Sequence, residues 1–234
     1  LLIASAKNPE GFFKDAEKII RKYKLSHSYK KDIVPDSLKK EFKKTYYARF
    51  NKDGYDKLRL CVNNYQKNDP LILYILLIYG FNRMLRFNSG GKFNLPVGNV
   101  DFNKNVVNAL NGYFDFVHDK KISVTSKDFK KFFSDKKYSK NDFVYLDPPY
   151  LISASEYNKL WNPKSETDLL KMIDGLDKKG VKFALSNVTH YNGSKNDLLL
   201  EWMKKYKVHK IESNYISYHN NSKKIIKEVL ITNY

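Results

Sequence analysis

The tetrapeptide Asp147-Pro148-Pro149-Tyr150 directly follows a short apolar run, residues 143–146. A short apolar run that ends at a turn signal is typical of a buried strand. Each proline ring fixes its own φ angle and removes a backbone N–H donor, and Pro149 also restricts Pro148 to extended conformations. The sequence therefore predicts a strand at residues 143–146 that leaves its sheet in a rigid, extended loop.

The polar groups of this loop suit chemistry at an exocyclic amine. The amino nitrogen of adenine is a poor nucleophile because its lone pair is delocalised into the ring, and two fixed hydrogen-bond acceptors can hold it closer to tetrahedral geometry. The Asp147 carboxylate and the Pro148 carbonyl can be those acceptors, and Tyr150 can stack on a base that has left its duplex. The alternative is an ordinary strand-to-loop exit, since Asp and Pro are common turn residues.

The charge balance favours a polyanionic partner. The 234 residues include 43 Lys and Arg against 25 Asp and Glu, which gives a formal net charge of +18. Such an excess is typical of nucleic-acid-binding proteins, although a lysine-rich genome would produce the same composition without a binding surface. The length suits one sizeable domain or a domain with an inserted lobe.

Several classes of protein are disfavoured by composition. Cys61 is the single cysteine, so neither a disulfide framework nor a thiolate zinc cluster is expected, and the five histidines show no paired metal spacing. The longest apolar stretch, residues 71–79, is too short to span a bilayer, and the first residues do not resemble a signal peptide. We expect a cytoplasmic protein with no metal and no membrane partner.

Hydrophobic periodicity predicts helices that alternate with strands. Helices are expected at residues 11–23, 57–64, 71–79, 103–113, 129–133, 166–178 and 196–206, and strands at residues 122–124, 143–146, 181–186, 209–218 and 228–232. This alternation indicates an α/β sheet with an antiparallel finish.

Residues 81–98 have an unusual composition for a turn region. An Asn-Ser-Gly-Gly centre at residues 88–91 predicts a hairpin or a hairpin-like loop. Cations alternate with aromatic rings along its two arms: Arg83, Arg86 and Lys92 with Phe81, Phe87 and Phe93. Cations can bind phosphates or guanine edges, and rings can wedge between bases. A structural hairpin with solvated cations is the alternative interpretation.

In these segments the chain resembles the Dam-type adenine-specific DNA methyltransferases of the α group of amino methyltransferases, phage-like members above all. The matching segments are residues 79–99, 142–161, 182–188 and 228–233, in the family's order. The resemblance implies a Rossmann-like S-adenosylmethionine-dependent methyltransferase sheet with an inserted helical and β-hairpin target-recognition region. Residues 1–121 would form the recognition region, with the hairpin at about 81–100, and residues 122–234 the catalytic region.

The resemblance also assigns roles to single residues. Asp147, Pro148, Pro149 and Tyr150 would form the catalytic motif, and Phe129, Asp147 and Tyr157 would contact the cofactor S-adenosylmethionine. Double-stranded DNA would be contacted by Phe81, Asn82, Arg83, Met84, Arg86, Lys92 and Pro96, with Arg86 reading a guanine. The implied reaction is direct methyl transfer to a flipped adenine, with GATC as the expected site and a restriction-modification or phage setting.

The start of the chain departs from this family. Its members begin with a lysine-bearing segment, a Gly-rich strand-to-helix turn and an acidic strand end, which hold the methyl donor. Residues 1–10 resemble the helix that follows those elements, so an N-terminal portion of roughly sixty residues is expected to be missing. Two alternatives stay open: a non-catalytic DNA-binding fragment or complementing half of a split methyltransferase, and the same chemistry on RNA adenine or the cytosine amine.

Overall fold

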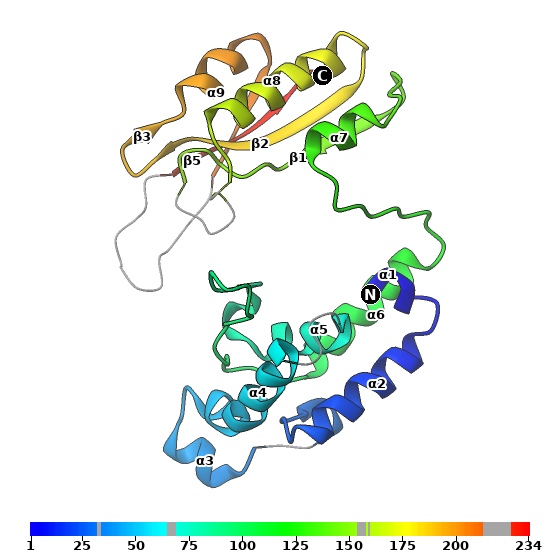
Figure 1. Ribbon diagram of the computed structural model, residues 1–234, viewed down its shortest axis with the longest axis vertical. Helices are drawn as coiled ribbons and strands as arrows, with labels where there is room; N and C mark the ends of the chain where they lie inside the picture. The colour runs from blue at the N-terminus through cyan, green and yellow to red at the C-terminus, as the bar shows by residue number, and fades with distance from the viewer. Residues whose placement is uncertain (32–33, 65–68, 154–157, 159, 213–225) are drawn as a thin grey trace. The chain divides into compact units, whose positions relative to one another are not determined.

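The computed structural model describes residues 1–31, 34–64, 69–153, 158, 160–212 and 226–234. The chain divides into two compact units, Leu1–Val124 and Thr125–Tyr234 (Figure 1). Each unit has a hydrophobic core of its own.

The first unit is helical. Its elements are α1 (Leu2–Ser5), α2 (Pro9–Lys22), η1 (Ser28–Lys30), α3 (Asp36–Glu41), α4 (Tyr46–Asn64), α5 (Pro70–Tyr79), η2 (Phe81–Arg83) and α6 (Lys104–His118). Apolar side chains from α2, α4, α5 and α6 form one core, with α5 at its centre (Figure 1). None of the helices in the described ranges is long and apolar enough to cross a membrane.

Helix α5 forms where local signals predict it. The Asp69 side chain accepts hydrogen bonds from the backbone N–H groups of Leu71 and Ile72 at 2.9 and 3.1 Å, which caps the first turn. Pro70 occupies the first helical position, where its missing N–H has no cost. The helix ends at Tyr79, as expected.

Helix α4 is longer than its sequence suggests. The sequence predicted a helix only at residues 57–64, yet Gly54 lies inside the 19-residue helix. A Cβ atom at Gly54 would lie 2.0 Å from the carbonyl oxygen of Tyr23, at the end of α2. Gly54 therefore permits the close approach of two chain segments, and its low helix propensity is overridden by tertiary packing.

We expect Gly54→Ala to destabilise the first unit, because the added methyl group would collide with backbone that cannot move aside. The free energy of unfolding should fall by about 2–3 kcal/mol, as measured by urea unfolding followed by circular dichroism. Gly112→Ala is the matched control, since Gly112 also lies within a helix and its Cβ would meet no atom within 4 Å. The free energy of unfolding of Gly112→Ala should rise by about 0.5–1 kcal/mol, because alanine has a higher helix propensity than glycine. Equal stability of the two variants would contradict the close approach.

The second unit contains a mixed sheet. Its elements are α7 (Phe129–Ser134), β1 (Phe143–Leu146), α8 (Pro163–Asp177), β2 (Lys182–Tyr191), β3 (Ser194–Lys195), α9 (Asp197–Trp202), η4 (Met203–Lys205), β4 (Lys207–Ile211) and β5 (Ile226–Thr232). The strand order is β1-β2-β5-β4, with β1 parallel to β2 and the other pairings antiparallel (Figure 1). The α/β class and the antiparallel finish are confirmed.

Two strand predictions need correction. Residues 122–124 are irregular chain and form no strand: Ile122 and Val124 are 39% and 77% exposed, so burial of their side chains does not stabilise an extended segment. Strand β2 continues to Tyr191, well past the expected end at residue 186, and turns back into β3. The turn residues Asn192 and Gly193 both have positive φ angles, so the Asn-Gly pair is a hairpin signal that the sequence analysis missed. Residues 213–218 of the expected 209–218 strand lie outside the described residues.

One face of the sheet carries the core of the second unit. Leu146, Phe183, Leu185 and Ile231 pack with apolar residues of α8 and α9. The side chains of β1 that alternate with the core-facing ones, Phe143 and Tyr145, are 56% and 58% exposed. Strand β1 is also the last strand of the sheet in the described part of the chain, so its outer edge has no strand partner there.

Candidate active site and recognition loop

The residues Asp147–Tyr150 leave the sheet at the carboxyl end of β1. Leu146 is buried and pairs with Leu185 of β2, so the strand is anchored up to the residue before the motif. Asp147 is exposed, and its Oδ1 accepts a hydrogen bond of 2.9 Å from the Tyr150 hydroxyl. In the part of the chain that the structure describes, no donor is bonded to the Pro148 carbonyl. Two acceptors of the kind that an amine requires therefore follow one another on a rigid loop.

The far end of the loop is tied down by two side chains that the sequence analysis missed. The Tyr150 carbonyl accepts hydrogen bonds from Asn158 Nδ2 at 2.6 Å, from the Ser153 hydroxyl at 3.2 Å and from the Ser153 backbone N–H at 3.0 Å. Asn158 Nδ2 also donates to the Ser153 carbonyl at 2.6 Å. Short polar side chains after a turn commonly bond nearby backbone in this way, which is the signal that could have found them.

Phe129 begins α7, where the Asp128 side chain caps the helix by accepting from the Lys130 N–H at 2.9 Å. The Phe129 ring lies 5.4 Å from the ring of Trp161, and both side chains pack at the edge of the second core. The pair forms a partly exposed aromatic wall. The other expected cofactor contact, Tyr157, lies outside the described residues.

A buried carboxylate, that of Glu166, is hydrogen-bonded to Trp161 of this aromatic wall. Glu166 of α8 is fully buried, and its carboxylate accepts hydrogen bonds from Trp161 Nε1 at 2.7 Å, Asn187 Nδ2 at 3.1 Å and Asn196 Nδ2 at 3.0 Å. The sequence analysis missed Glu166, although it lies three and four residues before Leu169 and Leu170 and so shares their core-facing side of the helix. A polar side chain on the core-facing side of a helix is buried, and a buried polar group requires hydrogen-bond partners.

Residues 80–98, which we call the recognition loop after the role expected of them, form a hairpin-like loop and not a regular two-stranded hairpin. Isolated bridges join Gly80 to Val97 and Phe87 to Phe93. The Phe81 N–H donates to the Pro96 carbonyl at 2.9 Å, and a Cβ atom at Gly98 would lie 2.7 Å from the Gly80 carbonyl oxygen. The two arms are therefore joined at the base of the loop, where glycine permits the contact. They are joined again near its tip, where the Asn88 N–H donates to the Lys92 carbonyl at 2.9 Å.

Most of the expected DNA-contacting side chains are exposed on this loop. Phe81, Asn82, Arg83, Met84, Lys92 and Pro96 are exposed, whereas Arg86 is half-buried. Asn82 and Arg83 both have φ angles of +52°, in the left-handed region. Consecutive non-glycine residues in this region are strained, and such strain is concentrated at functional sites.

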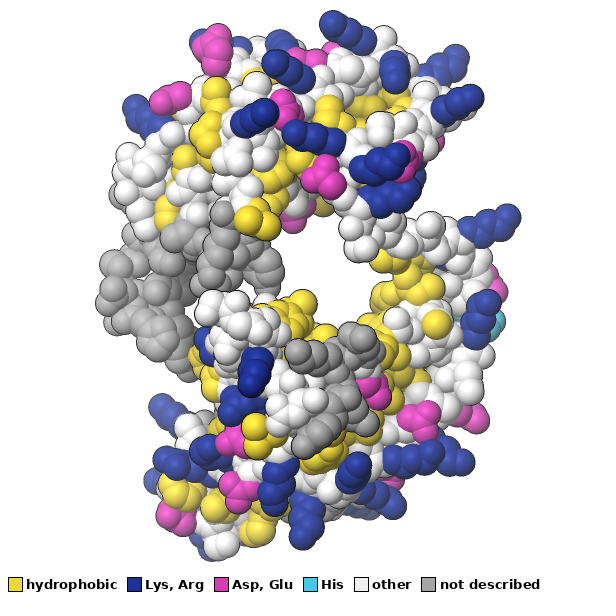
Figure 2. Space-filling model, in the orientation of Figure 1, with side chains coloured by type: hydrophobic (Ala, Val, Ile, Leu, Met, Phe, Trp, Pro, Cys, Tyr) yellow, Lys and Arg dark blue, Asp and Glu magenta, His cyan; other side chains and the backbone are white. Residues whose placement is uncertain are grey.

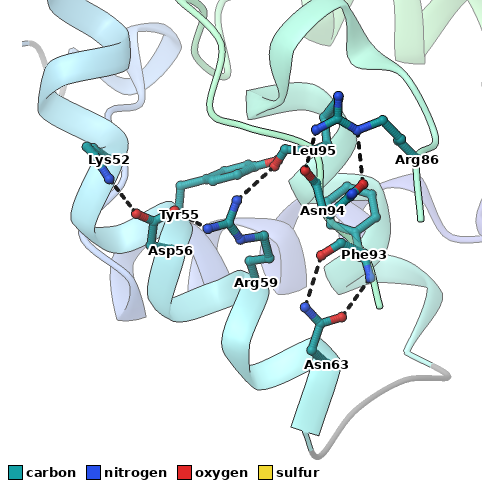
Figure 3. Close-up of polar contacts among 9 residues, drawn as sticks. All are labelled: Lys52, Tyr55, Asp56, Arg59, Asn63, Arg86, Phe93, Asn94 and Leu95. Carbon is teal, nitrogen blue, oxygen red and sulfur yellow. Dashed lines mark hydrogen bonds and ion pairs between the residues drawn. The ribbon is translucent and has the colours of Figure 1, made fainter. Parts of the chain in front are cut away.

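Helix α4 holds the recognition loop through contacts that only the structure reveals (Figure 3). The Asn63 side chain donates to the Phe93 carbonyl at 3.0 Å and accepts from the Phe93 N–H at 2.8 Å. It thus makes the pair of backbone hydrogen bonds that a neighbouring β-strand would make with Phe93. The Leu95 carbonyl accepts hydrogen bonds from the Tyr55 hydroxyl at 3.1 Å and from Arg59 Nη1 at 3.2 Å. Burial raises the pKa of Tyr55, so this hydroxyl stays a donor even in alkaline solution where a free tyrosine would ionise.

Comparison with known families decides what kind of protein this is. The model of the family "D12 class N6 adenine-specific DNA methyltransferase" matches residues 14–216, which include both the recognition loop and the Asp147–Tyr150 motif. The chain belongs to the D12 class of N6 adenine-specific DNA methyltransferases.

Curated relatives of this D12-class chain are modification enzymes. It is 40% identical over 197 residues to the type II methyltransferase M.FokI of Planomicrobium okeanokoites and 38% identical over 200 residues to the modification methylase StsI of Streptococcus sanguinis, with 80% of the chain covered in both cases. It is 33% identical over 191 residues, 78% of the chain, to the modification methylase LlaI of Lactococcus lactis subsp. lactis. The matched part is 30%, 30% and 29% of these three relatives, so the chain spans about a third of their length.

The surface of the D12-class chain is basic in both units. Figure 2 shows lysine and arginine side chains scattered over the visible face of each unit. Several are paired with acids, such as Lys127 and Lys131 with Asp135, which hold the pKa of the Asp135 carboxyl below its usual range. Among the described residues, no three His, Cys, Asp or Glu side chains are grouped as a metal site would require.

Proposed function

We propose that this chain carries out methyl transfer from S-adenosylmethionine to the N6 amine of adenine at a specific site in duplex DNA. The observation that carries the proposal is the exposed Asp147 carboxylate followed by a Pro148 carbonyl that no donor occupies in the described part of the chain. One amine hydrogen would bond to each acceptor, which localises the nitrogen lone pair for attack on the methyl carbon. Tyr150 would stack on the flipped base.

S-adenosylmethionine, when bound, contributes the activated methyl group. The aromatic wall of Phe129 and Trp161 fits its adenine ring, since both rings are partly exposed and held in place by the core behind them. Asp147 and Tyr157 are the other residues that we propose to face the methyl donor.

We propose that the recognition loop selects the DNA site. Its exposed side chains combine cations with apolar groups, as base reading and wedging require. Arg86 would read a guanine, Phe81 and Asn82 would press into the base stack, and Arg83, Met84, Lys92 and Pro96 would contact the duplex. GATC is the site that we propose, and the cytoplasm of a bacterial or phage-infected cell is the setting.

We further propose that an N-terminal portion outside this sequence completes the fold. The outer edge of β1 has no strand partner among the described residues, and Phe143 and Tyr145 are more than half exposed. Paired strands and a second helical layer would cover both features, as in a doubly wound Rossmann-like sheet. In this arrangement residues 1–121 act as the recognition region and residues 122–234 as the catalytic region.

The same open edge favours one second candidate, a DNA-binding fragment or complementing half without catalysis of its own. It differs from the first candidate in binding duplex DNA while transferring no methyl group until the missing portion is added.

The test is incubation of the 234-residue chain with radiolabelled S-adenosylmethionine and unmethylated GATC duplex, beside a chain extended upstream from its native gene. Duplexes with other adenine sites, single-stranded RNA and a duplex whose site consists of G·C pairs without adenine complete the panel. We expect label in N6-methyladenine with at least the extended chain. If only the extended chain transfers methyl groups, the result supports the second candidate, in which the 234-residue chain is a fragment without catalysis of its own. If both chains bind duplex DNA and neither transfers a methyl group, the result contradicts the enzymatic proposal. Label in RNA or cytosine would overturn the proposed substrate.

A further inference from the structure

Arg86 is held by one edge of its guanidinium group. Its Nε donates to Asn94 Oδ1 at 2.9 Å and its Nη2 donates to the Asn94 carbonyl at 2.6 Å (Figure 3). A guanidinium has five N–H donors in one planar fork, so this edge uses two of them. Of the other three, two lie on the end of the fork, one on each Nη atom, and Nη1 has no hydrogen-bond partner among the described residues. Arg86 thus has one edge occupied and one edge available.

Asn94 is itself fixed in place. Its backbone N–H donates to the Arg86 carbonyl at 3.1 Å, and its neighbours Phe93 and Leu95 are only 2% and 1% exposed. Both neighbours are bonded to helix α4, Phe93 through Asn63 and Leu95 through Tyr55 and Arg59 (Figure 3). The plane of the Arg86 guanidinium is therefore set by α4 through Asn94.

We propose that Asn94 is a positioning residue for base recognition, which holds the side edge of Arg86 so that the end of its fork meets a guanine. Guanine presents two acceptors, O6 and N7, side by side in the major groove, and the end of an arginine fork matches that pair. Asn94 is neutral, so Arg86 keeps its full positive charge, whereas a carboxylate at this position would offset it. The inference rests on the proposed function, because it takes the recognition loop to read DNA.

A phosphate group could also accept two hydrogen bonds from the same fork. The surroundings favour a base edge, because Met84 and Leu85 on the same arm of the loop are 37% and 45% exposed. Apolar side chains suit the floor of a groove better than the charged backbone of DNA. The two ligands also differ in their effects, since phosphate contacts affect all sequences alike and base contacts affect one position.

The test is selection by the 234-residue chain from a pool of duplexes with about ten randomised base pairs, followed by sequencing of the bound fraction. Four proteins are compared: the unchanged chain, Arg86→Ala, Asn94→Ala and the double variant. We expect Arg86→Ala to lose a guanine preference at one position and Asn94→Ala to reduce that same preference roughly tenfold. The double variant should resemble Arg86→Ala, since Asn94 acts through Arg86.

Two further variants keep the result interpretable. Asn94→Asp retains an acceptor for Nε and should keep the guanine preference at the same position, with weaker binding overall. Asn88→Ala removes another asparagine of the loop, one that bonds the Lys92 N–H and not Arg86, and should leave the preference unchanged.

Each contrary outcome has a distinct meaning. Unchanged guanine preference in Asn94→Ala overturns the positioning role, and so do additive losses in the double variant, a loss at a different base pair, or loss of the preference in Asn94→Asp. A uniform loss over all sequences assigns Arg86 to phosphate and overturns the inference. If Arg86→Ala itself keeps every preference, the proposed reading of guanine by Arg86 fails, and the inference fails with it.

Discussion

Asp147→Ala should reduce methyl transfer by about three orders of magnitude or more, because it removes one of the two acceptors that we propose to activate the amine. The expected loss is in kcat, since the interaction with Asp147 strengthens as the nitrogen becomes tetrahedral. Asp147 is exposed, so the free energy of unfolding should change by less than roughly 0.5 kcal/mol. The measurement is single-turnover transfer from labelled S-adenosylmethionine, using whichever form of the protein transfers methyl groups.

Tyr150→Phe is the matched control for this change. It removes the hydroxyl that donates to Asp147 at 2.9 Å and retains the ring that we propose to stack on the base. We expect a loss of less than about tenfold, because stacking needs the ring face and not the hydroxyl. Full transfer by Asp147→Ala, or an equal loss in both variants, would contradict the role given to the carboxylate.

Glu166→Ala should have the largest effect on stability, about 3 kcal/mol of the free energy of unfolding of the second unit. The substitution leaves the donors of Trp161, Asn187 and Asn196 without their shared acceptor in a fully buried place. A buried donor without a partner loses its hydration and gains nothing in return. Urea unfolding followed by tryptophan fluorescence measures the fall in the free energy of unfolding. Trp161 reports directly on the change, because its indole donates to the Glu166 carboxylate that the substitution removes.

Glu201→Ala provides the comparison for Glu166→Ala. Glu201 is an exposed glutamate of the neighbouring helix α9 and pairs with Lys204 on the surface. Its removal should change the free energy of unfolding by less than about 0.5 kcal/mol, as exposed ion pairs contribute little. If the two glutamate variants were equally stable, the buried network would not hold Trp161 in place. Weaker binding of S-adenosylmethionine by Glu166→Ala is a second expectation, because Trp161 packs on Phe129.

Features that depend on near neighbours in sequence were predictable from the sequence. Helix α5 lies within one residue of the predicted range 71–79, because Asp69, Pro70 and Gly80 act within one turn of it. The strand before Asp147 and the loop after it were predicted for the same reason, since proline restricts its own residue and the one before it. The family was also evident, because its motif lies on a single continuous segment.

The tertiary structure alone decided which residues support these segments. Gly54 looks like a helix breaker until Tyr23 is seen against it, and Asn63 looks like a surface residue until Phe93 is seen 30 positions later. Glu166 likewise finds Asn187 and Asn196 only when α8 packs on the sheet. Capping and proline geometry act over a few residues, so the sequence by itself determined the motif, the central helix and the family. Burial and hydrogen bonding between distant segments depend on how the chain folds back on itself, and only the folded chain could show them.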